Sequence, residues 1–140
     1  MNITKTTHSE EESSAIAAQL ASSIKAPAVI CLEGDLGAGK SVFARGFLRS
    51  LGVTGPIASP TFSLVQLYQA GDTQLAHMDL YRLEDDEEAY AAGIEELIHD
   101  SNTICLIEWP QRLSWMLPDE VIKVNISHQG EDQRLLEINP

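Results

Sequence analysis

Apolar residues form two continuous runs in this chain, and both runs have the composition of buried strands. Ala28–Leu32 reads AVICL, and Thr103–Glu108 reads TICLIE. Short apolar runs without a polar face are typical of parallel strands that are covered on both sides. Each run contains one of the two cysteines, Cys31 and Cys105, which we expect to be buried, free thiols.

Other segments alternate between apolar and polar residues, which predicts further strands. Ile3–Thr7 alternates weakly and is predicted to be an edge strand. The stronger candidates form two hairpins, with turns at Ala70–Asp72 and Gly130–Asp132. The four predicted hairpin strands are Leu64–Gln69, Thr73–Leu80, Val121–Ser127 and Gln133–Ile138. We expect Leu64–Gln69 and Val121–Ile138 to be antiparallel additions to the sheet.

Capping residues and helical spacing predict the helices. Ser9 followed by Glu12 forms a capping box, which opens an amphipathic helix that continues to about Ile24. A second helix covers Ser41–Leu51, where apolar residues recur at helical spacing. The acidic run Glu84–Glu88 begins a third helix, because acids in a first turn favour the helix dipole. This run is either a solvated face or a docking surface.

Strands that alternate with helices in this way indicate an α/β fold. We predict a central, mostly parallel sheet that is flanked by helices and supplemented by antiparallel hairpin strands. The chain has 140 residues and no internal repeat or linker, so residues 1–140 are expected to form a single domain. No apolar stretch is long enough to span a membrane, and the N-terminus lacks the layout of a signal peptide. We therefore expect a cytoplasmic protein without membrane contact.

The segment from Gly34 to Ser41 reads GDLGAGKS. It matches G-x-x-x-x-G-K-[ST], the phosphate-binding loop of P-loop NTPases, and it lies in the required order of strand, glycine loop and helix. Glycines let the backbone approach phosphates, which the N–H groups of the loop and of the helix N-terminus surround. The alternative is an ordinary glycine-rich turn. The favoured interpretation is a single P-loop NTPase domain that binds ATP.

The motif also predicts the roles of individual residues in the loop. Lys40 reaches the β and γ oxygens of the nucleotide, and the Ser41 hydroxyl coordinates Mg²⁺. The predicted nucleotide contacts are Asp35, Leu36, Gly37, Ala38, Gly39, Lys40, Ser41 and Val42.

Two acids directly after predicted strands are candidates for the chemistry. Ligands of such folds lie at the carboxyl ends of the parallel strands, where we expect Asp79 and Glu108. Because Mg²⁺ usually takes one or two carboxylates plus phosphate oxygens, the predicted metal ligands are Ser41, Asp79 and Glu108. Lys40, Glu108 and Thr61 are the predicted catalytic residues, and Glu108 orients or activates the attacking water.

Several neighbouring residues leave alternatives open. Thr61, in the Ser59–Phe62 loop, contacts the γ-phosphate or its Mg²⁺, or belongs to a plain turn. His77 is either satisfied within its strand or in contact with the acids. Arg82 either faces the γ-phosphate or forms a surface pair, and Trp109 either packs over the site or fills the core.

The adenine base is expected on the side of the loop away from the γ-phosphate. The predicted hairpin Ser127–Gln133 and the start of the first helix both flank the loop on that side. His8 and Arg134 are the predicted contacts, with the Arg134 guanidinium stacking on the base.

The charge of the chain limits its partners. The net charge is −12, from 21 acidic and 9 basic residues. Binding to nucleic acid depends mainly on Lys and Arg side chains that neutralise phosphates. We therefore expect no independent tight binding to RNA or DNA.

Four motifs in fixed order, GDLGAGKS, SPTF, HMDLYRL and LIEW, resemble those of the TsaE (YjeE) family. This is a family of small bacterial ATPases for the biosynthesis of threonylcarbamoyladenosine in tRNA. The resemblance covers nearly the whole chain. The phosphate loop alone is generic, but the four motifs together are specific. Ser41 stands where threonine is common in the family, and it keeps the hydroxyl.

The resemblance implies a partner and a role. Members bind the heterodimer of TsaB and TsaD and hydrolyse ATP to reset that complex. It also implies that Lys40 and Ser41 hold phosphate and Mg²⁺ and that Thr61 belongs to a switch-like loop. Asp79 and Glu108 are then the acids that handle the metal and the water. The acidic charge fits a factor that reaches tRNA through protein partners.

Two other functions are compatible with a phosphate loop. A small-molecule P-loop kinase needs an acceptor site and usually several arginines in a closing lid, but the arginines after Lys40 form no cluster. A GTPase normally has an N-K-x-D element for guanine, and the sequence contains none. The favoured activity is ATP hydrolysis that is slow alone and accelerated by partners.

Overall fold

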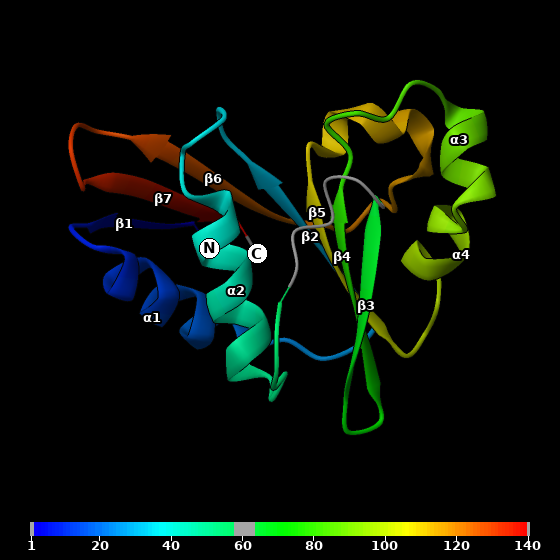
Figure 1. The fold of residues 1–140 in the computed structure, drawn as a ribbon, viewed down its shortest axis with the longest axis horizontal. Coiled ribbons are helices and arrows are strands. Elements are labelled where there is room, and N and C mark those ends of the chain that lie inside the picture. The colour runs from blue at the N-terminus through cyan, green and yellow to red at the C-terminus, as the bar shows by residue number, and fades with distance from the viewer. Residues whose placement is uncertain (1, 58–63, 140) are drawn as a thin grey trace.

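The computed structural model describes residues 2–57 and 64–139 (Figure 1). The described residues form one sheet of seven strands in the order β1-β7-β6-β2-β5-β4-β3. The strands are β1 (Ile3–Thr7), β2 (Ala28–Glu33), β3 (Val65–Ala70), β4 (Thr73–Asp79), β5 (Thr103–Glu108), β6 (Ile122–His128) and β7 (Arg134–Asn139). The helices are α1 (Glu10–Ala21), α2 (Lys40–Ser50), α3 (Asp86–Ala91), α4 (Ile94–Ile98) and the 3₁₀ helix η1 (Pro110–Met116). Within these residues, none of the helices has the length and apolar character that a membrane span requires.

The centre of the sheet is parallel, and its two sides are antiparallel. The strands β6, β2, β5 and β4 are mutually parallel. On one side β7 and β1 are added antiparallel, and on the other side β3 is added as a hairpin with β4. The predicted α/β architecture, the edge position of Ile3–Thr7 and the hairpin before Asp79 are confirmed.

The direction of β6 differs from the prediction. We expected the whole of Val121–Ile138 to be an antiparallel addition, but β6 runs parallel to β2, and only its pairing with β7 is antiparallel. Val124 and Ile126 are buried, while the residues between and beside them are partly or fully exposed. The alternation of apolar and polar residues in β6 therefore indicates a strand with one buried face. It does not indicate whether the strand is parallel or antiparallel to its neighbours.

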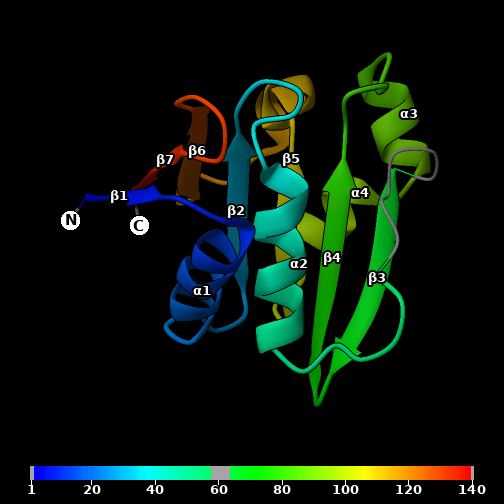
Figure 2. The ribbon, with the colours of Figure 1, turned by 60° about the vertical axis from the view of Figure 1, so that its left-hand side comes forward.

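Helices cover the two faces of the sheet in separate groups (Figure 1 and Figure 2). On one face α1 and α2 pack against alternate residues of β2 and β5, such as Ile30 and Leu106. On the other face α3, α4 and η1 pack against the residues between them, such as Cys31 and Ile107. Both central strands are therefore buried on both sides, which explains their continuous apolar runs.

The capping prediction for α1 is confirmed with one change of partner. The Ser9 hydroxyl accepts a hydrogen bond from the Glu12 N–H at 3.1 Å. The Glu12 carboxylate accepts from the His8 N–H, also at 3.1 Å, in place of the Ser9 N–H of a standard capping box. α1 ends at Ala21 and does not reach Ile24, because the backbone tightens into a turn in which the Ile24 N–H bonds the Ala21 carbonyl at 3.2 Å.

The acidic third helix is confirmed as α3. Its N-cap is Asp85, whose carboxylate accepts from the Glu88 N–H at 2.9 Å. Gly93, with φ at 75°, separates α3 from α4. Ala89 of α3 and Ile94 and Ile98 of α4 are buried in the core on the sheet face that also carries Cys31 and Ile107.

A close approach between α1 and α2 depends on Gly46. A Cβ at this position would lie 2.8 Å from the Ser14 Cα atom. Gly→Ala in an exposed helix normally stabilises by about 1 kcal/mol. Here we expect Gly46→Ala to lower the free energy of unfolding by about 1–3 kcal/mol, since one helix backbone must move. Urea unfolding measures this, with the exposed Arg45→Ala as the control. Unchanged stability in Gly46→Ala would show that the helices separate without cost.

The two thiols are buried and free, as predicted. Burial raises the pKa of Cys31 to about 12, and the nearby Glu33 adds to the effect. Burial likewise raises the pKa of Cys105 to about 12, with a smaller contribution from Asp100.

Only the thiolate reacts with a disulfide reagent, so the folded protein should resist Ellman's reagent at about pH 8, where an unperturbed thiol is partly ionised. Both thiols should react at once in denaturant, whereas rapid reaction of the folded protein would contradict their burial.

Candidate functional site

The glycine-rich loop joins the carboxyl end of β2 to the first turn of α2. Gly34 lies against β6, where a Cβ would come within 2.5 Å of the Ile126 carbonyl oxygen. Gly37 and Gly39 have φ at 79° and 108°, in the left-handed region that favours glycine. α2 begins directly after Gly39, at Lys40, so the loop leads into the unpaired N–H groups of a helix N-terminus. This arrangement suits an anion.

Lys40 is a buried cation at the centre of the site. Its ammonium group donates hydrogen bonds to the carbonyl of Gly34 and, at 3.3 Å, to that of Asp35. It also lies 4.1 Å from the centroid of the Trp109 ring, in a cation–π contact. Burial lowers the pKa of Lys40, and the nearby Glu108 and Asp79 carboxylates oppose this effect. The positive charge is thus partly shielded from water and lies near two acids.

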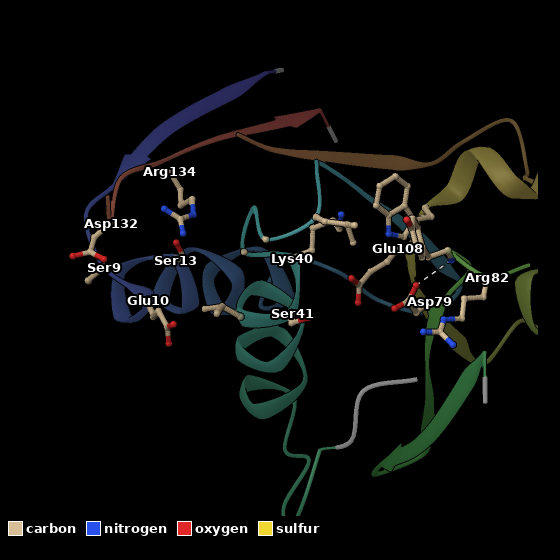
Figure 3. A pocket seen from close by; sticks show the side chains of 16 residues that line it. Ser9, Glu10, Ser13, Lys40, Ser41, Asp79, Arg82, Glu108, Asp132 and Arg134 are labelled. Carbon is tan, nitrogen blue, oxygen red and sulfur yellow. Dashed lines mark hydrogen bonds between the residues drawn. The ribbon is translucent and has the colours of Figure 1, made fainter. Parts of the chain in front are cut away.

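A pocket of about 510 Å³ opens over the loop. Figure 3 shows Lys40 in its middle, between two groups of polar side chains. At one end lie residues of α1 and of the β6–β7 hairpin, among them Ser13 and Arg134. At the other end lie Asp79, Arg82 and Glu108. The pocket therefore extends from the start of α1 to the carboxyl ends of β4 and β5.

Most of the predicted loop contacts line this pocket. The lining residues from the loop and the start of α2 are Leu36, Gly37, Gly39, Lys40, Ser41 and Val42. Asp35 and Ala38 are not among the described lining residues. Their backbone carbonyls accept hydrogen bonds from Lys40 and Arg134, so they hold the shape of the loop.

The two predicted acids meet at the carboxyl ends of neighbouring strands. Asp79 of β4 lies opposite Glu108 of β5 in the parallel register. Glu108 is buried, and its carboxylate lies 2.7 Å from the His77 ring, between Glu108 Oε2 and His77 Nε2. Asp79 is half-buried, and its carboxylate accepts from the Tyr81 N–H at 3.1 Å. The position predicted for both acids is confirmed.

His77 and Trp109 were each given two alternatives by the sequence, and the structure shows their contacts. His77 contacts an acid of the site, through the bond to Glu108. Trp109 meets both alternatives, because it lies at the site against Lys40 and the Tyr81 ring, at 5.0 Å between ring centroids, and also packs against the core. Its backbone has φ at 61°, which turns the chain directly after β5. Arg82 lines the pocket beside Asp79 (Figure 3).

Arg134 and His8 lie at the end of the pocket where we expected the base. The Arg134 guanidinium lines the pocket, and its Nε donates to the Ala38 carbonyl at 2.9 Å. It also donates to the carbonyls of Glu131 and Gln133, both at 3.0 Å. His8 contacts the Gln133 side chain at 3.2 Å and is not among the described lining residues. Arg134 thus ties the β6–β7 hairpin to the glycine-rich loop.

The predicted metal ligands belong to the lining of this pocket. Ser41, Asp79 and Glu108 all line it. Among the described residues, no three His, Cys, Asp or Glu side chains form a preformed metal site. Thr61, the third predicted catalytic residue, lies outside the described residues.

A family model described as "Threonylcarbamoyl adenosine biosynthesis protein TsaE" matches residues 7–136. The chain belongs to the TsaE family. A TsaE protein of Bacillus subtilis is 42% identical over 124 residues, which cover 89% of this chain and 77% of the relative. The TsaE protein of Rickettsia conorii is 40% identical over 134 residues, 95% of this chain and 75% of the relative. The TsaE protein of Haemophilus influenzae is 41% identical over 110 residues, 79% of this chain and 68% of the relative.

A solved structure agrees with this assignment. The crystal structure of Bacillus subtilis YdiB superposes with a TM-score of 0.83 at 34% sequence identity. The match covers 99% of this chain and 84% of the other. The fold of this TsaE-family chain, from β1 to β7, is therefore similar to one that has been solved by experiment.

Sequence reasoning missed several lining residues of this TsaE-family site. They are Ser9, Glu10, Ser13 and Tyr81, whereas Asp132 lies in the hairpin Ser127–Gln133 that was expected beside the base. Ser9 and Glu10 carried a signal, because the capping box placed a helix start close to the expected base position. Ser13 is buried and bonds the Thr7 hydroxyl at 2.8 Å. Its place in the pocket follows from the packing of α1 beside α2, which the sequence does not reveal.

Proposed function

We propose that this protein is a Mg²⁺-dependent ATPase that acts in threonylcarbamoyladenosine modification of tRNA, by binding the TsaB–TsaD complex and resetting it through ATP hydrolysis. One observation carries the ATPase part. Lys40, at the start of α2, and Asp79 and Glu108, at two parallel strand ends, line the same pocket. A phosphate-binding cation, a metal-binding acid and a water-orienting acid are the parts that such a hydrolase requires.

Each part has a place in the pocket. The loop N–H groups and Lys40 hold the phosphates, and Ser41 with Asp79 holds the Mg²⁺. The metal ion, when bound, neutralises charge on the phosphate oxygens. Glu108 accepts a proton from the attacking water or orients it toward the γ-phosphate. The base lies toward Ser9, Ser13 and Arg134, at the far end of the pocket.

The partner follows from the family and from the charge. The family is named for threonylcarbamoyladenosine biosynthesis, yet a net charge of −12 disfavours tight contact with tRNA phosphates. Action through a protein complex resolves this conflict. The described cations at the pocket are Lys40, Arg82 and Arg134, and Arg134 is already bonded to three backbone carbonyls. We therefore expect slow hydrolysis by the isolated protein.

Steady-state ATP turnover with and without purified TsaB–TsaD tests this proposal. We expect the pair to raise turnover by about 10-fold or more, since a cation supplied in trans can raise such rates by about 10³. The pair without this protein gives the background rate. Fast turnover that the pair leaves unchanged would contradict the partner role. Phosphate transfer to a small acceptor, in place of release to water, would favour a kinase.

A further inference from the structure

A buried histidine touches one of the proposed catalytic acids. His77 lies in β4, two residues before Asp79 and therefore on the same side of the strand. Its side chain is 4% exposed and that of Glu108 is 6% exposed, and His77 Nε2 lies 2.7 Å from Glu108 Oε2. Both groups are thus shielded from water, and the bond between them is short.

The proposed role of Glu108 determines which ring nitrogen carries the proton. A general base acts in its ionised form, and an ionised carboxylate only accepts hydrogen bonds, so His77 Nε2 is the donor. In the neutral ring, Nδ1 is then an acceptor, and it is buried without a hydrogen-bond partner among the described residues. A buried polar atom without a partner is unfavourable and calls for an explanation. An apolar side chain would pack there without this cost, so the use of the ring lies in its Nε2–H group.

We propose that His77 is a positioning residue that holds the Glu108 carboxylate for water activation. This inference rests on the proposed ATPase function. The terminal torsion of a glutamate is broad and leaves its two oxygens free to exchange places. A charge-assisted hydrogen bond to Oε2 removes that freedom, so that Oε1 keeps one direction. His77 touches neither nucleotide nor water in this role, and it acts only through Glu108.

Two variants separate the hydrogen bond from packing. His77→Met fills similar space without a donor, whereas the side-chain amide of His77→Gln can still donate to Glu108. We expect His77→Met to lower kcat for ATP about 10-fold or more, as for the loss of a group that orients a general base. KM and the dissociation constant for Mg·ATP should stay within about threefold. His77→Gln should recover most of the lost kcat.

A double variant tests whether His77 acts through Glu108. In a Glu108→Gln background, His77→Met should cause little further loss, because residues that act as a unit are not additive. An equal further loss, or a raised KM with unchanged kcat, would overturn the positioning role. Absence of ATP turnover in the wild-type protein would instead refute the proposed function, and the inference with it.

A measurement without any variant covers the case in which His77→Met does not fold. Long-range ¹H–¹⁵N spectra of the wild-type protein report the tautomer of each ring. We expect the His77 ring of the wild-type protein to carry its proton on Nε2. A His77 ring protonated only on Nδ1 could not donate to Glu108, and this result would overturn the inference.

Discussion

Lys40→Ala should abolish productive ATP binding, with an affinity for Mg·ATP at least about 100-fold below that of the wild type. Hydrogen bonds to a charged group contribute about 1.5–3 kcal/mol each, and a lysine in this loop makes more than one to the phosphates. Lys40 is also a buried residue, so bulk water weakens its attraction to an anion less than it would at an exposed lysine. Titration calorimetry at fixed Mg²⁺ measures the loss.

Lys40 also bonds the carbonyls of Gly34 and Asp35 and packs under Trp109. Its removal could therefore loosen the loop as well as remove a charge. Lys40→Met separates the two effects, because it keeps an unbranched apolar stem against the indole ring. We expect it to be as deficient as Lys40→Ala. Lys25→Ala, at an exposed lysine outside this pocket, is the matched control for loss of one positive charge. Near-normal affinity in Lys40→Met would refute the assignment of the loop to phosphate.

Local patterns were sufficient to predict the part of the site that lies on a single strand–loop–helix unit. The order of an apolar strand, three glycines and a helix start determined where Lys40 would lie. The proximity of Asp79 and Glu108 was also predictable, because parallel strands end at the same edge of a sheet. The burial of both faces of β2 and β5 followed from their composition in the same way.

Contacts between distant elements were not predictable. Arg134 bonds the Ala38 carbonyl because β7 pairs with β6 and β6 lies beside β2. Local sequence patterns contain no information on that strand order, and the alternation in β6 is compatible with its parallel pairing to β2 as well as with its antiparallel pairing to β7. The guanidinium that we expected to stack on adenine is bonded to three backbone carbonyls. Any stacking would use the face of the guanidinium while its N–H groups keep these bonds.

The largest effect on turnover is expected for Glu108→Gln. The variant should keep its affinity for Mg·ATP within a few-fold and lose ATP hydrolysis by about 10²-fold or more, as is usual for loss of a general base. The amide oxygen of the new side chain can still accept the His77 Nε2–H, so the buried contact at 2.7 Å survives the change. A fall in the rate of ATP hydrolysis would then be due to the loss of a basic carboxylate at position 108. An unchanged urea unfolding curve would show that the fold is intact.

Asp79→Asn is the matched comparison, because it neutralises the acid directly opposite on the neighbouring strand. Asp79 is half-buried, lies at the carboxyl end of β4 and lines the pocket, so we assign it to the metal. Its loss should weaken ATP binding in the presence of Mg²⁺ and change binding without Mg²⁺ much less. Single-turnover rates at saturating Mg·ATP separate the two roles, because they are insensitive to affinity. If Glu108→Gln loses affinity while hydrolysis at saturation persists, the roles of the two acids are the reverse: Glu108 holds the metal and Asp79 orients the water.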